Sequence, residues 1–433
     1  MQILLLSFYS SREPTNTTSQ TQIMIQTITR FLFSCFILLS SHQFLAQPAE
    51  CNGIRYILSP FDADSTIGVQ YGQATTLGGV EQDLLMDVYE PAGDTIAQRP
   101  LVILAHGGSF VRGTRQELRP LCEVFAAAGY VCATISYRLQ DTETADSTEF
   151  AEELIMAMND LKASVRYFRQ DAATTNTYRI NPDQVYVGGT SAGAIMAVNM
   201  AYMAEDDEIP AYLQEHIDNN GGFEGNSNDI TDFTSEVQGV ISYSGSILRL
   251  SWMDEGDPPY VAIHEELDPT VICGLSKLDS TATPYFIRGA CDMEVRAEEV
   301  GISNNTVIFE GSTEHVGYFF NANQLAVAFA TLGFLEDLYC SQANTVSVDP
   351  ALSNAVSIYP NPTNDKFQIT SERLSGQTEV AIFNMSGQAV LTQTQLWQRG
   401  GRLEVSLADL PSGIYTVMLS LEEGRVMKRV LKN

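Results

Sequence analysis

A serine set among small residues follows directly on an apolar run near the middle of the chain. Residues 185–188 read Val-Tyr-Val-Gly and residues 189–193 read Gly-Thr-Ser-Ala-Gly, after which the pattern becomes helical. This spacing predicts a sharp strand-to-helix turn with Ser191 at its tip. A Cβ atom at Gly189 or Gly193 would crowd such a turn against the neighbouring strand and helix. The feature therefore constrains the chain to a sheet whose strands lead into helices.

The pentapeptide alone is equally consistent with a plain tight turn, but the sequence upstream of it favours a functional one. Residues 101–105 read Leu-Val-Ile-Leu-Ala, a continuous apolar run typical of a parallel strand buried on both faces. The run ends in a loop at residues 106–110 that reads His-Gly-Gly-Ser-Phe. Such a glycine-rich loop can offer backbone N–H groups to a group reacting at the serine.

The two motifs resemble those of the α/β-hydrolase superfamily, and within it the carboxylesterase and hormone-sensitive-lipase-like esterases, over roughly residues 68–335. The resemblance implies that Ser191 is the nucleophile. It also implies that the N–H groups of Gly108 and Ser109, joined by that of Ala192, hold the oxyanion of a tetrahedral intermediate. Ser109 stands where the family often has a third glycine, so this departure bears on the shape of the loop.

A serine needs a base to take its proton, and the chain has five histidines: His42, His106, His216, His264 and His315. The first three are set aside because they lie, in this order, in the N-terminal segment, in the glycine-rich loop, and in an acidic stretch between predicted elements. The superfamily places its histidine after the last strand, which favours His315, on the loop following a strand predicted at residues 306–309. His264 is the alternative; it ends a strand predicted at residues 260–263, where it would otherwise be a satisfied polar group.

The acid is expected after the strand at residues 260–263, where Glu265, Glu266 and Asp268 all qualify by position. Residues 264–269 read His-Glu-Glu-Leu-Asp-Pro and resemble the family's His-Gly-x-x-Asp-Pro segment, with Glu265 in place of the glycine. Asp268 is preferred because the following proline stiffens the turn that carries the carboxylate. The runner-up is Asp292, which we expect on the next helix rather than on a catalytic loop.

The pattern between these motifs predicts the fold independently of them. Apolar residues recur at steps of three and four from Phe150 to Phe168, which predicts an amphipathic helix between strands at residues 131–135 and 185–187. Residues 237–243 supply a further buried strand. Alternating strands and helices predict an α/β-hydrolase fold with a mostly parallel sheet, whose functional face lies at the carboxyl ends of its strands. Ser191, Asp268, His315 and the glycine-rich loop all lie at such ends.

The chain changes character after Cys340. Residues 341–355 are predicted to be a polar linker, and residues 356–433 show short alternating strands separated by turn signals, which predicts a small all-β sandwich. Three of its segments, at residues 356–362, 381–387 and 410–415, resemble the C-terminal sorting domain of type IX secretion substrates. A carbohydrate-binding sandwich is the alternative, with Trp397 as its one aromatic candidate and no clear binding platform.

The N-terminal residues predict export. Residues 31–39 form a short apolar core after Arg30, and Ala46 is a plausible cleavage position, so residues 1–46 are expected to be leader and signal peptide. This core is too short for a stable transmembrane span, and no second long apolar segment follows. The catalytic domain is then expected at residues 47–340. We expect a secreted or cell-surface protein, exported through the periplasm of a Gram-negative bacterium, that interacts with the secretion machinery and has no stable membrane insertion.

Export through an oxidising compartment makes the cysteines informative. Without Cys35, six remain. A bond between Cys51 and Cys340 would join the ends of the catalytic domain, and one between Cys273 and Cys291 would brace the segment after Asp268. The remaining two, Cys122 in a helix and Cys132 at the start of a strand, are expected at opposite ends of the sheet and hence to be buried thiols.

The formal charge of −29 argues against nucleic acid and anionic membranes as partners. Asp206, Asp207 and the stretch at 218–232 could hold a calcium ion, but a solvated loop or a cap over the pocket is preferred. No cofactor and no metal is implied. The sequence therefore predicts a secreted serine hydrolase of carboxylic esters, small or linked to a polymer. The alternatives are a serine peptidase on the same fold and a non-catalytic binding protein.

Overall fold

The structure, a computed structural model, describes residues 51, 54–141, 147–278, 285–321, 323–342, 356–361, 363–371, 376–383, 389–397, 401–421 and 424–432. The predicted leader at residues 1–46 and most of the predicted linker lie outside these residues. Within the described part, no helix is long and apolar enough to cross a membrane.

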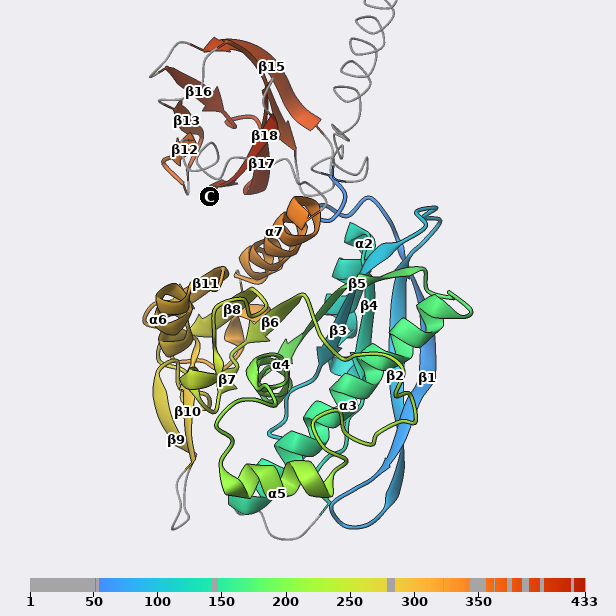
Figure 1. Cartoon of the computed structure of the whole chain (residues 1–433). Helices are drawn as coiled ribbons and strands as arrows, with labels where there is room; N and C mark the ends of the chain where they lie inside the picture. Colours follow the sequence, from blue (N-terminus) through green and yellow to red (C-terminus); the bar gives the residue numbers. More distant parts are fainter. Residues whose placement is uncertain are drawn as a thin grey trace, which may run out of the picture. The chain divides into compact units, whose positions relative to one another are not determined.

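An eight-stranded sheet lies at the centre of the part of the structure that precedes residue 343 (Figure 1). In sheet order its strands are β1 (Ala63–Thr75), β2 (Glu81–Pro91), β4 (Val131–Ile135), β3 (Arg99–Ala105), β5 (Ile180–Thr190), β6 (Gly239–Tyr243), β8 (Tyr260–Glu265) and β11 (Asn304–Phe309). Neighbours from β4 to β11 run parallel, whereas β1 with β2 and β2 with β4 are antiparallel. The predicted mostly parallel sheet is confirmed, and the antiparallel edge of β1 and β2 is an addition.

Helices cover both faces of this sheet. They are α2 (Arg119–Ala128), α3 (Ser147–Ala173), α4 (Ala192–Tyr202), α5 (Ala211–Asn219), α6 (Ala290–Val300) and α7 (Gln324–Gln342), with short 3₁₀ turns η1 (Arg115–Leu118), η2 (Leu250–Trp252) and η3 (Gly317–Phe319). Strand β3 shows why two layers form, because alternate side chains point to opposite faces. Leu101 and Ile103 join the core under α3 and α4, and Val102 and Leu104 join the core under α2 and α7. The crossovers before and after β4 therefore lie on opposite faces, and open α/β sheets commonly bind ligands where crossovers change face in this way.

A second, three-stranded sheet is built from strands on both sides of β8 in the sequence. It consists of β7 (Ser246–Ile247), β10 (Tyr285–Gly289) and β9 (Leu275–Leu278), all antiparallel. The disulfide Cys273–Cys291 ties the start of this sheet to α6, and Cys51–Cys340 ties the N-terminal segment to α7. Both predicted pairings are confirmed.

Cys122 and Cys132 are free and buried, as predicted. Their expected separation is wrong, because the two sulfur atoms lie 2.9 Å apart. Helix α2 packs across the sheet close to β4, so a residue in mid-helix meets one near the start of the strand.

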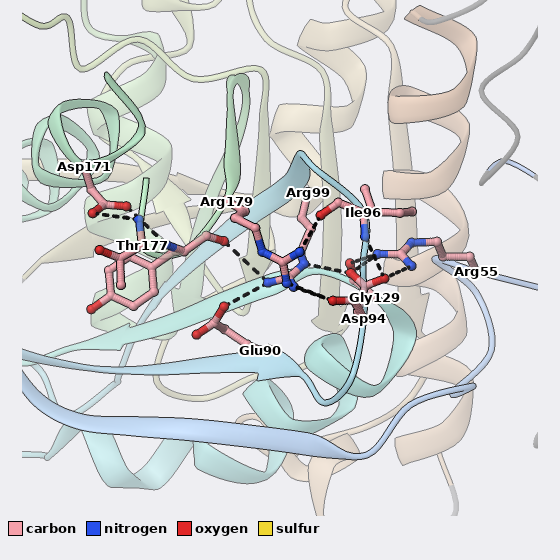
Figure 2. A network of polar contacts seen from close by, with 10 residues as sticks. Arg55, Glu90, Asp94, Ile96, Arg99, Gly129, Asp171, Thr177 and Arg179 are labelled. Atoms are coloured by element: carbon pink, nitrogen blue, oxygen red, sulfur yellow. Dashed lines mark hydrogen bonds and ion pairs between the residues drawn. The ribbon is translucent and has the colours of Figure 1, made fainter. Parts of the chain in front are cut away.

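A buried network of charges joins the N-terminal segment to the start of β3 (Figure 2). Arg55 donates twice to Asp94, over 2.9 and 2.8 Å, and Arg99 donates to the same carboxylate over 2.7 Å. Burial opposes ionisation of Asp94, but the two guanidinium groups outweigh it and lower its pKa to about 2. This network lies at the amino end of β3, opposite the glycine-rich loop, and is structural.

The acidic insertion at residues 205–236 includes α5, and its second half lies along α3. Asn159 donates to the carbonyl of Asn220 over 3.0 Å, and Arg166 pairs with Glu224 over 2.9 Å. The second half of the insertion is thus a polar segment that packs along α3 through hydrogen bonds and an ion pair. In the described ranges, no group of three or more His, Cys, Asp or Glu side chains could hold a metal ion.

The C-terminal residues form two antiparallel sheets with a core of their own. One contains β12 (Val356–Tyr359), β13 (Lys366–Ser371) and β16 (Arg402–Ser406); the other contains β15 (Ala389–Trp397), β14 (Gly376–Phe383), β17 (Gly413–Leu421) and β18 (Gly424–Lys432). The predicted sandwich is confirmed. Trp397 is buried in its core with Phe367 and Val417, so its ring is not available as a sugar platform.

Candidate active site

Ser191 lies at the junction of β5 and α4, as the sequence predicts. Its backbone has φ 51° and ψ −117°, a conformation that side-chain-bearing residues rarely adopt. Its N–H donates to the carbonyl of Tyr243 on β6 over 2.8 Å. A Cβ atom on Gly189 or Gly193 would lie 2.2 or 2.0 Å from the carbonyl oxygen of Ala105, which confirms that both positions require glycine. The residue is 8% exposed, so the turn is more enclosed than an open elbow.

His315 connects this serine to a carboxylate. Its Nε2 lies 2.9 Å from Oγ of Ser191, and its Nδ1 lies 2.6 Å from Oδ2 of Asp268. A carboxylate at Nδ1 favours the tautomer that carries its proton there, which leaves Nε2 as an acceptor for the serine hydroxyl. The arrangement is that of a serine activated by a base that a third group orients.

Asp268 lies on a buried turn after β8 and is 2% exposed. Its Oδ1 accepts the N–H groups of Thr270 and Val271 over 2.8 and 3.0 Å. Burial alone would raise the pKa of this carboxyl, but the hydrogen bonds from His315 and the two N–H groups outweigh it, and the pKa lies below its usual value. Asp268 is therefore ionised at neutral pH where it faces the imidazole.

The other residues considered as base or acid make hydrogen bonds elsewhere. His264 is buried at the end of β8, where its Nε2 donates to the carbonyl of Val271 over 2.7 Å and burial lowers its pKa. It therefore supports the acid turn as a neutral group, although its Nδ1 has no partner within the described part of the chain. Glu266 is exposed and accepts the N–H of Gly311. Asp292 lies on α6, as expected, and pairs with Arg288.

One histidine assignment is wrong. His216 does not lie between elements but in α5, where it is buried and approaches Glu152 of α3 to 3.5 Å. Its helix was overlooked because acidic and amide residues interrupt the apolar spacing of Leu213 and Ile217. His106 lies in the glycine-rich loop as predicted, stacked on Tyr137, and burial lowers its pKa.

The glycine-rich loop has an unusual backbone. Gly108, Ser109 and Phe110 have φ values of 118°, 56° and 62°. A Cβ atom on Gly108 would lie 2.0 Å from the carbonyl oxygen of Arg112, so this position requires glycine. Ser109 adopts the left-handed conformation that glycine adopts more readily, which gives the family's third glycine a physical reason.

Three N–H groups are open near the serine. Those of Gly108 and Ser109 donate to no acceptor among the described residues. Ala192 is the first residue of α4, so its N–H is one of the donors that a helix leaves without an internal partner. A Cβ atom on Gly107 would lie 3.2 Å from that of Ser191, which places loop and serine in contact.

Two further residues lie beside Ser191, His315 and Asp268, and the sequence does not predict their roles. Glu265 qualifies by its position as a possible acid, but the structure buries it against the backbone that follows His315. Tyr318 is buried, and its hydroxyl contacts Ser244 and the carbonyl of Ile263. No motif marks either residue, and only the departure of Glu265 from glycine could have drawn attention to it.

The sequence matches two family models. Residues 86–247, which include both the glycine-rich loop and the serine turn, match the BD-FAE model. This segment is a BD-FAE domain. Residues 357–433 match the secretion system C-terminal sorting domain. The chain therefore joins a hydrolase domain of esterase type to a type IX sorting domain, and it is exported to the surface or surroundings of a Gram-negative bacterium. Both resemblances predicted from the sequence are confirmed.

Solved structures similar to the chain include esterases. The propionate-bound esterase 2 of Thermogutta terrifontis is 20% identical, with 66% of this chain and 97% of that chain covered and a TM-score of 0.45. The same enzyme phosphoramylated by tabun is 20% identical, with 66% and 98% covered and a TM-score of 0.46. A truncated carbohydrate esterase from gut microbiota is 14% identical, with 64% and 98% covered and a TM-score of 0.47. Among curated proteins, no sequence matches.

Proposed function

We propose that this chain is a serine hydrolase that cleaves carboxylic esters through an acyl-enzyme. The observation that carries this proposal is the continuous chain of hydrogen bonds from Asp268 through His315 to Ser191. The open N–H groups beside the serine supply the complementary half of such a site. The assignment of the esterase class by the BD-FAE match is consistent with this chemistry.

The reaction follows from this geometry. Oγ of Ser191 attacks the acyl carbon while its proton passes to Nε2 of His315, and the carbonyl oxygen becomes an oxyanion. The N–H groups of Gly108, Ser109 and Ala192 hold that oxyanion. When the intermediate collapses, the alkoxide leaves and takes the proton from Nε2, which frees an alcohol.

Water then repeats these steps on the acyl-enzyme. Its proton passes to Nε2, its oxygen bonds to the acyl carbon, and Ser191 leaves with the proton as a carboxylic acid is released. Asp268 remains ionised throughout and stabilises the imidazolium that forms in each half-reaction. None of these steps requires a group other than the residues named and water.

We further propose the division of the chain into leader at 1–46, catalytic domain at 47–340, linker at 341–355 and sorting domain at 356–433. The substrate is proposed to be an ester of small size or one attached to a polymer, with a short acyl chain because no long apolar lid helix is predicted. The sorting domain is proposed to bind the secretion machinery.

A panel of esters tests the activity. Hydrolysis of p-nitrophenyl acetate, butyrate and palmitate should be measured beside a feruloyl ester and acetylated xylan, with Ser191→Ala as the blank. We expect turnover of acetate or butyrate by the wild type only. Faster turnover of palmitate than of butyrate would contradict the short-chain proposal. Cleavage of a peptide amide without any ester cleavage would favour the peptidase, and no labelling by a fluorophosphonate would favour the binding protein.

A further inference from the structure

Glu265 ends β8, three residues before Asp268, at a position where the resemblance to esterases leads one to expect glycine. Its side chain is 1% exposed. A buried carboxylate is costly unless hydrogen-bond donors surround it. The hydrogen-bond donors around this carboxylate therefore indicate its structural role.

Those donors come from the backbone directly after His315. Oε1 of Glu265 accepts the N–H of Tyr318 over 3.3 Å, whereas Oε2 has no hydrogen-bond partner among the described residues. Burial raises the pKa of Glu265, while the nearby backbone N–H groups of Gly317, Tyr318 and Val316 oppose the rise. The carboxylate thus lies near the N–H groups of three consecutive residues in the loop that carries His315, and it bonds to that of Tyr318.

This loop segment is strained, so it needs such support. Val316 is a β-branched residue with φ 51°, a left-handed conformation that is unfavourable for its side chain. A Cβ atom on Gly317 would lie 2.7 Å from the Cβ atom of Glu314, so a larger residue there would require the loop to shift. Strained backbone persists only where the surroundings hold it, and here the buried carboxylate of Glu265 bonds to the N–H of the residue after Gly317.

The next residue anchors the same segment from the other side. The hydroxyl of Tyr318 lies 3.2 Å from the carbonyl oxygen of Ile263 and 3.1 Å from Oγ of Ser244. Both partners lie at the carboxyl ends of sheet strands, β8 and β6. Tyr318 therefore ties the segment at residues 316–318 to the sheet twice, through its hydroxyl group and through its N–H, which Glu265 accepts.

We propose that Glu265 is a positioning residue for the base: its carboxylate holds residues 316–318 and so keeps the imidazole of His315 between Asp268 and Ser191. This inference rests on the proposed function. It replaces the idea of Glu265 as the catalytic acid, because the carboxylate faces backbone N–H groups while Asp268 holds the imidazole.

The test compares Glu265→Ala and Glu265→Gln in the full chain with Glu266→Gln as a matched control. Glu266 is the adjacent carboxylate, but it is exposed and accepts one N–H from Gly311, a bond that glutamine can keep. For each variant, thermal melting, kcat and KM on p-nitrophenyl acetate, and the rate of labelling by a fluorophosphonate are measured. The low-field proton NMR signal of Nδ1 of His315 is recorded as a readout that needs no substrate.

Loss of the positioning carboxylate should lower kcat and leave KM nearly unchanged. We expect kcat of Glu265→Ala to fall about 10- to 100-fold, because small displacements of catalytic groups have effects of this size. Labelling should slow by a similar factor, and the Nδ1 signal should broaden. Glu265→Gln, which keeps one acceptor oxygen, should lie between Ala and wild type, and Glu266→Gln should match wild type.

The alternative is a role in stability alone. If Glu265→Ala and Glu265→Gln melt earlier but keep wild-type kcat and a sharp Nδ1 signal, the proposal is wrong. A rise in KM at constant kcat would also overturn it. Should the Ala variant fail to fold, the Gln variant decides by the same measurements. Should the wild type neither cleave esters nor become labelled, the proposed function fails, and the Nδ1 signal alone then tests whether Glu265 positions His315.

Discussion

The Nδ1 atom of His315 lies 2.6 Å from Oδ2 of Asp268, although 47 positions separate the two residues. The carboxylate is buried and fixed by two backbone N–H groups, whereas 20% of the imidazole is exposed. The fixed carboxylate of Asp268 therefore orients the more accessible imidazole of His315. The second nitrogen of the ring is directed at a serine hydroxyl, which is the requirement for a base in acyl transfer.

The first prediction concerns this hydrogen-bonded set. Ser191→Ala should abolish labelling by a fluorophosphonate and leave melting nearly unchanged, because it removes one oxygen from a small side chain. His315→Ala and Asp268→Asn should each lower kcat by about a thousandfold or more, leaving the residual catalysis of the oxyanion donors and of binding. Ester hydrolysis under saturating substrate measures both.

His264→Ala is the control for the base. His264 lies beside the acid turn and does not bond to Ser191, so its loss should cost less activity than loss of His315. Activity that survives His315→Ala but disappears in His264→Ala would overturn the assignment of the base.

Much of this site could be predicted because its signals are local. The glycines around Ser191 are required by contacts within a few ångströms of the turn, so their spacing marks the site without knowledge of the rest. Asp268 was identifiable from the proline that follows it. The contact between Glu265 and the loop after His315, by contrast, depends on how β8 and β11 pair, which no local pattern specifies.

In the fold, too, elements with a local sequence pattern are predictable and elements that depend on distant contacts are not. Buried parallel strands such as β3 are recognisable because every residue is apolar. Strand β1 escaped prediction because most of its side chains are exposed and show no alternation. Strands β9 and β10 are short, and β10 pairs with β7 and β9, which lie far from each other in the sequence, so no local hydrophobic pattern marks this sheet.

The second prediction concerns Glu153 on α3, which is 2% exposed. Neither of its carboxylate oxygens has a partner among the residues described, and burial, reinforced by nearby Asp141, raises its pKa to about 8. In the unfolded chain this group ionises near its ordinary value of 4.5. Between these values the unfolded chain loses a proton that the folded chain keeps, so stability falls as the pH rises through this window.

Glu153→Gln removes this titration. Its melting temperature should exceed that of the wild type at pH 8 to 9 and approach it near pH 4.5, in melts recorded across that range. A constant difference in melting temperature between the two proteins at every pH would show that the pKa of Glu153 is the same in the folded and unfolded states.

The third prediction concerns Asp94, whose carboxylate faces Arg55 and Arg99 (Figure 2). Asp94→Asn removes the carboxylate that Arg55 and Arg99 share, although Glu90 still pairs with Arg99, and should cost about 3–5 kcal/mol in the free energy of unfolding at pH 7. The pKa of Asp94 is lowered to about 2 from 3.8, so its contribution is present above the higher value and is lost as the pH falls through the lower one.

Urea unfolding at pH 7 and pH 3 measures this difference, which should shrink at the lower pH. Glu123→Gln is the matched control, since the pair of Glu123 with Arg119 lies on the surface, where solvent screens it. Equal effects of the two substitutions would mean that the buried network contributes no more than a surface pair.

The fourth prediction concerns the thiols Cys122 and Cys132, which are both fully buried. Burial raises the pKa of Cys132 well above its usual value, so little of the reactive thiolate forms. Iodoacetamide should alkylate neither residue in the native protein and both in denaturant without reductant. The four bonded cysteines should react only after reduction. Mass spectrometry that finds these two residues linked would contradict this expectation.

The last prediction concerns the sorting domain. Its core contains residues between Val356 and Val430 alone, and none of Ser191, His315 and Asp268 comes from it. Truncation near residue 345 should therefore leave ester hydrolysis and melting of the purified catalytic domain nearly unchanged, yet retain the enzyme in the periplasm of its host. A substrate-binding domain would instead permit secretion and lose activity on an insoluble polymer only. A truncated enzyme that reaches the medium would count against sorting, and one inactive on a small soluble ester would contradict both interpretations, because the domain would then have to complete or stabilise the catalytic site.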